Sequence, residues 1–93
     1  MNKNNLKINR NQVDKIDNQI FKLIKKRTKV VNQMLKLKKF KNQIIDHKRI
    51  NEILLKIKKK AIKNKIDPKI TNRIWKSMIW SYVHYQKKNF NKK

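Results

Sequence analysis

The 93-residue chain carries 28 Lys and Arg against five Asp and Glu, a formal net charge of +23, and it contains no cysteine and no glycine. Its length allows one domain with a modest core, and the missing cysteines together with two separated histidines exclude a disulfide framework, a thiolate nucleophile and a zinc set. No apolar run approaches the roughly 20 residues of a membrane span, and no signal peptide is recognisable, so we expect a cytoplasmic protein.

The first predicted element is a long helix from about residue 10 to 38. Its apolar residues step by three and four, with one gap of seven that contains Arg27. At 1.5 Å per residue this helix is roughly 40 Å long. The residues of the stripe are Val13, Ile16, Ile20, Leu23, Val30 and Met34.

Two shorter helices follow. Asp46 is suited to cap the second, and Asp67 is suited to cap the third because Pro68 then takes the first helical position, where a missing N–H costs nothing. The apolar stripe of the second helix is Ile50, Ile53, Leu54, Ile57 and Ala61, and that of the third is Ile74, Trp75, Met78, Ile79, Tyr82 and Val83.

The predicted fold is therefore all-α, with one long and two shorter helices in a single domain over residues 1–93. Residues 1–5 and 88–93 are expected to be flexible ends. Connections of about seven and four residues turn the helices back on one another. Two short helices cannot cover the middle of the long one, so we expect two chains to pair along their long helices as a homodimer.

Basic residues interrupt the predicted apolar stripe of the long helix. Arg27 and Lys38 are eleven residues apart, which places them roughly 20° apart on one face. Few carboxylates are present to neutralise them, so an anionic ligand would supply the missing charge. Outward bending of both side chains is the alternative. Arg10 lies about 25 Å before Arg27 and would reach the same anion only from a partner chain, unless it is a surface arginine.

Gln86 shares a face of the third helix with Trp75 and Tyr82. Its amide is either a satisfied core group or a donor in a binding site, and the spacing does not separate the two. The aromatic residues Trp75, Trp80 and Tyr85 follow helical spacing and are interpreted as packing residues.

Taken in order, Arg10, Asp17, Arg27, Lys38, the segment DHKR at 46–49, the capped IDPK at 66–69 and Gln86 resemble the all-helical chorismate mutases of the AroQ class. The similarity runs from about residue 6 to 87. It implies an intertwined dimer of three-helix chains, chorismate as the substrate, prephenate as the product and no cofactor.

The resemblance also implies a role for each matching residue. Arg27 and Arg49 would hold the two carboxylates of chorismate, and Arg10 would enter the site from the other protomer. Lys38 and Gln86 would donate hydrogen bonds to the ether oxygen of the breaking bond. The backbone of Asp46 would line the substrate near its ring hydroxyl.

The pattern departs from the family at two positions that we still assign to the substrate site. Ile50 stands where the family has a glutamate that accepts a hydrogen bond from the ring hydroxyl, and Tyr82 stands where a serine is frequent. Glu52 cannot replace the missing glutamate because two residues turn a helix by about 200°, to the solvent side, where pairs with Lys48 and Lys56 are expected. Activity should survive, with weaker binding or a slower step.

Three other functions stay open at this point. The charge fits a basic helical protein that binds nucleic acid, although the lysines are spread along the chain rather than gathered in a patch. An enzyme on the same scaffold that eliminates pyruvate from isochorismate would need similar arginines. A degenerate family member would be inactive alone and would bind another enzyme of the pathway.

Overall fold

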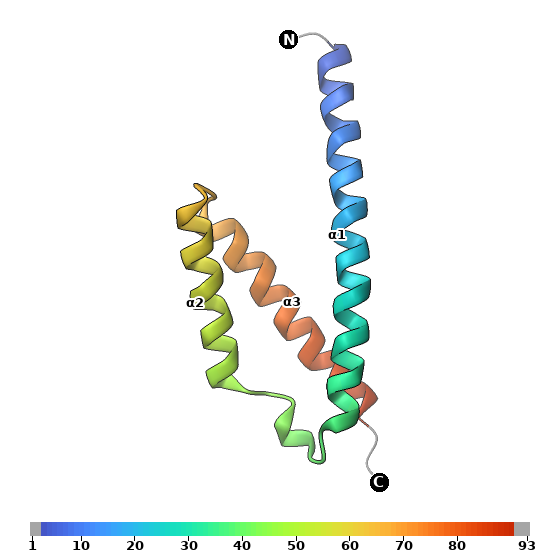
Figure 1. The fold of residues 1–93 in the computed structure, drawn as a ribbon, viewed down its shortest axis with the longest axis vertical. Coiled ribbons are helices and arrows are strands. Elements are labelled where there is room, and N and C mark those ends of the chain that lie inside the picture. Colours follow the sequence, from blue (N-terminus) through green and yellow to red (C-terminus); the bar gives the residue numbers. More distant parts are fainter. Residues whose placement is uncertain (1–2, 91–93) are drawn as a thin grey trace. The chain divides into compact units, whose positions relative to one another are not determined.

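The computed structural model describes residues 3–90, with side chains from residue 5 onward, and over that range it contains helices and no strands (Figure 1). Helix α1 spans Lys3–Leu37, α2 spans His47–Lys63, and α3 spans Pro68–Asn89, with a short 3-10 helix at Lys41–Gln43. The all-α prediction of one long and two shorter helices is confirmed. No helix in the described part of the chain is long and apolar enough to cross a membrane.

Helix α1 begins earlier than predicted, at Lys3 rather than near residue 10. No glycine or proline precedes residue 10, so nothing in the sequence stops the helix once it has formed. Residues 3–5 and 88–89, which were expected to be flexible, are helical, whereas residues 1–2 and 91–93 lie outside the described part. Flexibility of the ends stays a prediction.

The chain divides into two units, Met1–Gln33 and Met34–Lys93, and α1 passes through the boundary. The first unit consists of α1 alone. In the single chain its predicted apolar stripe is exposed, with Val13, Ile16, Ile20 and Leu23 each at least half accessible. The stripe therefore has no core of its own within this unit.

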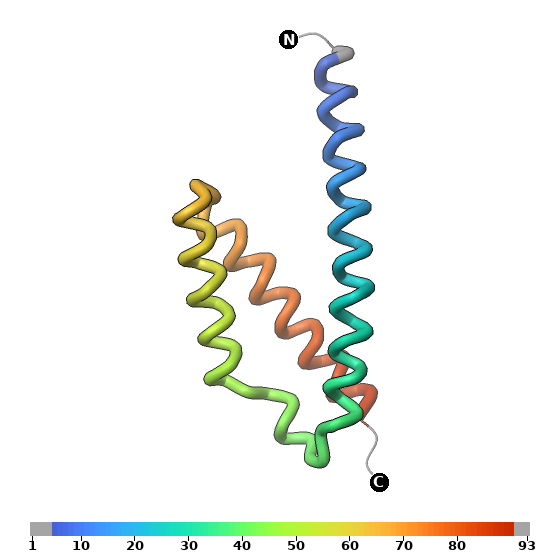
Figure 2. The backbone as a smooth tube through the Cα atoms, viewed as in Figure 1, coloured from blue at the N-terminus to red at the C-terminus, as the bar shows by residue number. Residues whose placement is uncertain are grey.

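The second unit is built around the α2–α3 hairpin, whose two helices pack against each other (Figure 2). Both predicted N-caps are present. The Asp46 carboxylate accepts a hydrogen bond from the Arg49 backbone N–H at 3.0 Å, and the Asp67 carboxylate accepts one from Lys69 at 2.9 Å. Such caps satisfy N–H groups that have no partner inside the helix.

The helix α2 ends in a turn that places Lys65 in the left-handed region, at φ 57°. The Ile66 N–H donates to the Ala61 carbonyl at 2.9 Å, and the Lys65 N–H donates to the Ile62 carbonyl at 3.2 Å. This pair of bonds is the Schellman motif, which usually has glycine at the left-handed position. The chain has no glycine, and a lysine takes that conformation instead.

The core of the second unit is small. It contains Ile44 from the connection, Ile50 and Ala61 from α2, and Ile79 and Val83 from α3, all buried. Ile74, which belongs to the predicted apolar stripe of α3, is 52% exposed in the single chain. Five residues separate Ile74 from Ile79, which turns it about 140° around the helix and away from the packed side.

The connection between α1 and α2 is ordered by one side chain. The Gln43 amide oxygen accepts the backbone N–H groups of Lys39 at 2.8 Å and Phe40 at 2.9 Å. Ile44, which follows directly, is 5% exposed. A polar and an apolar anchor thus fix the segment that joins Lys38 to the start of α2.

Candidate functional site

The second unit brings Lys38 and Gln86 together across 48 residues of sequence. The Lys38 ammonium donates a hydrogen bond to Oε1 of Gln86 at 2.8 Å. Among the described residues, the polar residue that is buried is Gln86, which is 8% exposed. Lys38 is half-buried. Since lysine has no acceptor, the bond fixes the Gln86 amide oxygen toward Lys38 and leaves the amide nitrogen as a donor.

The environment of Lys38 disfavours its charged form. Desolvation by burial lowers the pKa of the ammonium below the ordinary lysine value, and the negative charge of Asp46 opposes that shift. Desolvation is the larger of the two causes. An ammonium in this situation gains from any further negative charge placed beside it.

Asp46 and Arg49 lie at the start of α2. The backbone N–H of Arg49 bonds the Asp46 carboxylate, and the Arg49 guanidinium lies 3.7 Å from the Glu52 carboxylate. Both partners of that ion pair are more than half exposed. The expected solvent position of Glu52 is thus confirmed, although its partner is Arg49 rather than Lys48 or Lys56, because residues three apart are also neighbours on a helix.

The two departures from the family pattern lie on different helices of the second unit. Ile50 is 9% exposed, and its backbone N–H donates to the Asp46 carbonyl at 2.9 Å, so this side chain is inward as its helix position predicts. Tyr82 is half-buried on α3, and its ring makes an edge-on contact with Tyr85 at 6.3 Å between centroids. The structure therefore supplies no buried carboxylate at position 50.

The remaining predicted ligands, Arg10 and Arg27, lie on α1 in the first unit. Arg10 is exposed and Arg27 is half-buried. The two residues are 17 positions apart in one helix, a distance of about 25 Å, as the sequence predicted. Their placement at a site with Lys38 and Gln86 stays a prediction.

One contact was missed in the sequence. The His47 ring in the first turn of α2 lies 6.4 Å from the Trp80 ring on α3, tilted by 53°. Helical spacing identified Trp80 as a packing residue but gave no partner, since contacts between helices are not encoded by the period of either one. The contact ties the N-terminus of α2 to α3.

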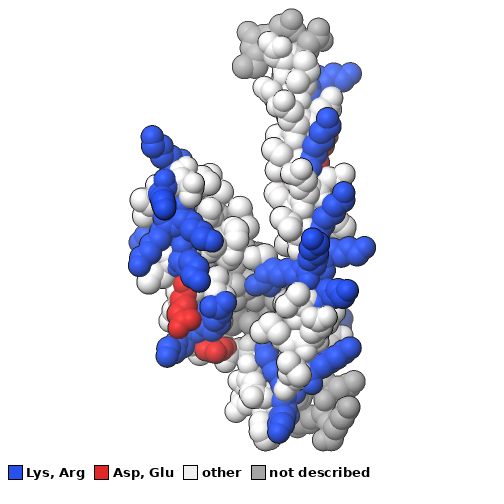
Figure 3. Space-filling view, in the orientation of Figure 1, with Lys and Arg blue, Asp and Glu red and all other residues white. Residues whose placement is uncertain are grey.

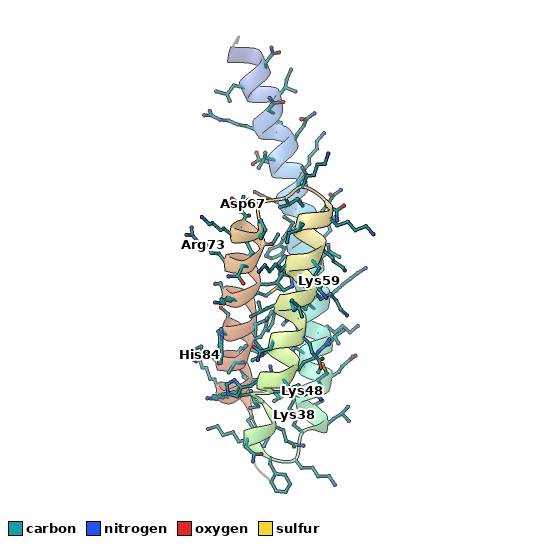
Figure 4. The ribbon with its side chains drawn as sticks, turned by 90° about the vertical axis from the view of Figure 1, so that its left-hand side faces the viewer. Lys38, Lys48, Lys59, Asp67, Arg73 and His84 are labelled. Atoms are coloured by element: carbon teal, nitrogen blue, oxygen red, sulfur yellow. The ribbon has the colours of Figure 1, made fainter. Side chains whose placement is uncertain are left out.

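Lysine and arginine side chains gather over the upper part of α2, whereas acidic groups of the face shown lie over its lower part (Figure 3). Lys38 lies at the same end of the hairpin as Lys48 and His84, whereas Asp67 lies at the other end (Figure 4). An ammonium and an oriented amide are groups that can bind a small anion.

Comparison with known families identifies the class more closely. The model of the family described as chorismate mutase type II matches residues 9–87. The chain therefore belongs to the type II chorismate mutase family, the AroQ class. No curated protein and no solved structure matched the chain.

Proposed function

We propose that the protein is a chorismate mutase that converts chorismate to prephenate, a step in the biosynthesis of phenylalanine and tyrosine. The observation that carries the proposal is the Lys38–Gln86 hydrogen bond, which joins two donor-bearing side chains from distant parts of the matched segment. Both residues belong to the second unit, Met34–Lys93.

The reaction suits a site with so few titratable groups. One C–O bond breaks as one C–C bond forms within the same molecule, and no proton, nucleophile or electron is transferred to the protein. What the protein supplies is a folded reactive conformer and stabilisation of the charge that builds on the ether oxygen. Stabilisation accelerates the step only where it is stronger in the transition state than in the substrate.

Lys38 and Gln86 supply that stabilisation in the proposed mechanism. The ammonium has three N–H donors and uses one on the Gln86 oxygen, which leaves two for a ligand. The Gln86 amide nitrogen is the other donor. Desolvation disfavours the isolated Lys38 ammonium. The negative charge that develops on the ether oxygen in the transition state therefore stabilises this ammonium more than the neutral ether of the substrate does.

Arginine side chains hold the two carboxylates of the substrate. Arg49 is paired with Glu52 in the free protein, and an exposed pair of this kind is worth about 0–1 kcal/mol, so a substrate carboxylate can replace it at small cost. Arg27 binds the other carboxylate, and Arg10 of a second copy completes the site. The exposed apolar stripe of α1 supports such a homodimer, because pairing would remove it from water.

The proposal is tested by following the loss of chorismate absorbance with purified wild type and Arg27→Ala. We expect turnover by the wild type and a loss of about 100-fold or more in kcat/KM for the variant, since a charged hydrogen-bonding group is removed from a substrate carboxylate. Arg73→Ala is the matched control, because Arg73 is an exposed arginine outside the proposed site, and it should stay close to wild type.

Two outcomes would contradict the proposal. Wild type without turnover at high chorismate would leave a binding role or a partner-dependent role. Turnover unchanged by Arg27→Ala would remove the proposed carboxylate site. Isochorismate in a parallel assay, with release of pyruvate as the readout, identifies the alternative lyase activity.

A further inference from the structure

Lys38 is the first residue after α1, so the regular hydrogen bonding of the helix does not by itself fix its backbone. Its own N–H donates to the Leu35 carbonyl at 3.2 Å, a bond that spans three residues rather than the four of an α-helix. The direction of the Lys38 side chain therefore depends also on the residues that follow it. That direction brings the ammonium to Gln86 on α3.

The side chain of Gln43 holds the peptide group on the other side of Lys38. A peptide group is planar, so the Lys38 carbonyl and the Lys39 N–H move as one unit. This N–H donates to Oε1 of Gln43 at 2.8 Å, and the Phe40 N–H donates to the same oxygen at 2.9 Å. With the bond to Leu35, both peptide planes that flank the Lys38 Cα are held, and these planes set the direction of its Cα–Cβ bond.

Gln43 is itself held in place by the fold. Its backbone N–H donates to the Phe40 carbonyl at 3.1 Å, which is reciprocal to the bond that its side chain accepts from the Phe40 N–H. The next residue, Ile44, is 5% exposed, and its N–H donates to the Lys41 carbonyl at 3.2 Å. The Gln43 side chain is exposed and fills no part of the core. Its removal should therefore alter the connection and leave the hairpin folded.

We propose that Gln43 is a positioning residue, which fixes the backbone on the C-terminal side of Lys38 so that the ammonium reaches Gln86. The inference rests on the proposed function, because Lys38 is the residue assigned to the ether oxygen. It adds a residue that the family resemblance does not name and that acts through Lys38 rather than on the substrate. Stabilisation of a developing charge depends on a donor in a fixed place, so catalysis depends on this exposed amide.

Three substitutions separate the acceptor of Gln43 from the rest of its side chain. Gln43→Met keeps a side chain of similar length but offers only a weak acceptor, and Gln43→Ala removes the acceptor completely. Gln43→Glu keeps a side-chain oxygen that accepts both N–H groups. Asn42→Ala is the matched control, because it removes the neighbouring exposed amide of the same 3-10 helix. Circular dichroism shows whether each variant is folded.

The mobility of the Lys38 side chain is measured without substrate, by NMR relaxation of the lysine ε-carbons. The Lys38 signal is identified by its loss in Lys38→Gln. We expect this carbon to be restrained in the wild type, in Gln43→Glu and in Asn42→Ala, because the bond to Gln86 is kept. In Gln43→Met and Gln43→Ala its relaxation should approach that of the exposed lysines.

Kinetics show whether the effect of Gln43 passes through Lys38. We expect Gln43→Met and Gln43→Ala to lower kcat/KM for chorismate by about fivefold or more, and Gln43→Glu and Asn42→Ala to stay within about twofold of wild type. In a Lys38→Gln background, Gln43→Ala should change kcat/KM by less than about twofold, because the contribution that Gln43 supports is already lost. A role in stability alone would act equally in both backgrounds.

An unchanged Lys38 ε-carbon in folded Gln43→Met and Gln43→Ala would overturn the inference, and so would equal losses of kcat/KM in the two backgrounds. Unfolding of both variants would overturn it as well, because Gln43 would then serve the fold rather than Lys38. A wild type without turnover would contradict the proposed function, whereas the relaxation data would still decide whether Gln43 positions Lys38.

Discussion

At the residue scale, position 50 decides how the proposed site treats the ring hydroxyl of chorismate. Ile50 is buried on α2, one residue after Arg49, and it offers no hydrogen-bond acceptor. Glu52 does not compensate, because it is exposed and paired with Arg49. The hydroxyl therefore has no carboxylate partner from this part of α2.

Ile50→Glu should raise kcat/KM for chorismate by about fivefold or more, because a restored hydrogen bond to a charged acceptor is worth about 1 to 3 kcal/mol. The measurement is initial-rate kinetics of chorismate loss, with circular dichroism to confirm that the variant is folded. Leu55→Glu adds the same charge to the exposed side of α2 and should leave kcat/KM within about twofold.

The opposite result is equally informative. If Ile50→Glu abolishes turnover in a folded protein while wild type is fully active, position 50 does not face the substrate. The assignment of Ile50 to the site would then be wrong.

At the element scale, the end of α2 carries a conformational cost. Lys65 occupies the left-handed region, where a side chain with a Cβ is strained by about 1 kcal/mol. Two hydrogen bonds of the Schellman motif and the burial of Ala61, at 2% exposed, maintain this turn. The chain thus completes the motif with a residue that is poorly suited to it.

Lys65→Gly should stabilise the protein by about 0.5–1 kcal/mol, because glycine takes positive φ without a steric cost. The matched control is Lys63→Gly, which makes the same change of side chain and charge at the last residue of α2. This substitution should destabilise the protein by about 1 kcal/mol. Urea unfolding followed by circular dichroism measures both. Destabilisation of equal size by the two variants would show that Lys65 is not held in the left-handed region.

The ends of the helices show which structural features can be predicted from neighbouring residues alone. The caps at Asp46 and Asp67 were predictable because each bond spans two or three residues and depends on one side chain and the adjacent backbone. The turn at Lys65 was not, since its usual marker is glycine. The early start of α1 was also missed, because lysine and asparagine give no sharp boundary where no proline or glycine stops a helix.

The candidate site was predictable only in part, for the same reason. Helical spacing showed that Arg27 interrupts an apolar stripe and that Gln86 lies on an apolar face, but it could not join Lys38 to Gln86 across 48 residues. The family resemblance supplied that pairing, and the hydrogen bond now supports it. The Arg49–Glu52 pair and the His47–Trp80 contact could not be predicted. Each side chain has several possible partners of similar interaction energy, and a single sequence does not show which partner is preferred.

At the scale of the whole molecule, the proposed homodimer makes each active site a product of two chains. In that arrangement Arg27 of one chain and Arg10 of the other serve the same substrate. A chain in which only one of these arginines is substituted would still contribute the other arginine to an active site of the dimer. This property distinguishes a shared site from two separate sites.

We expect Arg10→Ala and Arg27→Ala to be nearly inactive alone and to regain activity when mixed after unfolding and refolding together. Random pairing makes half of the dimers hybrid, and each hybrid has one site with both arginines intact, so recovery should approach roughly a quarter of wild-type activity. Refolding each variant alone is the control. Dimers detected by sedimentation without any recovered activity would contradict the shared site.

Gln43, whose amide oxygen accepts two backbone N–H groups, has a consequence for ligand binding as well as for folding. Its amide oxygen fixes the two residues that follow Lys38, and Ile44 anchors the same segment in the core. The segment from Lys38 to Asp46 is thereby ordered in the free protein. A ligand that binds there loses little affinity to the restriction of chain motion, because the entropic cost has already been met during folding.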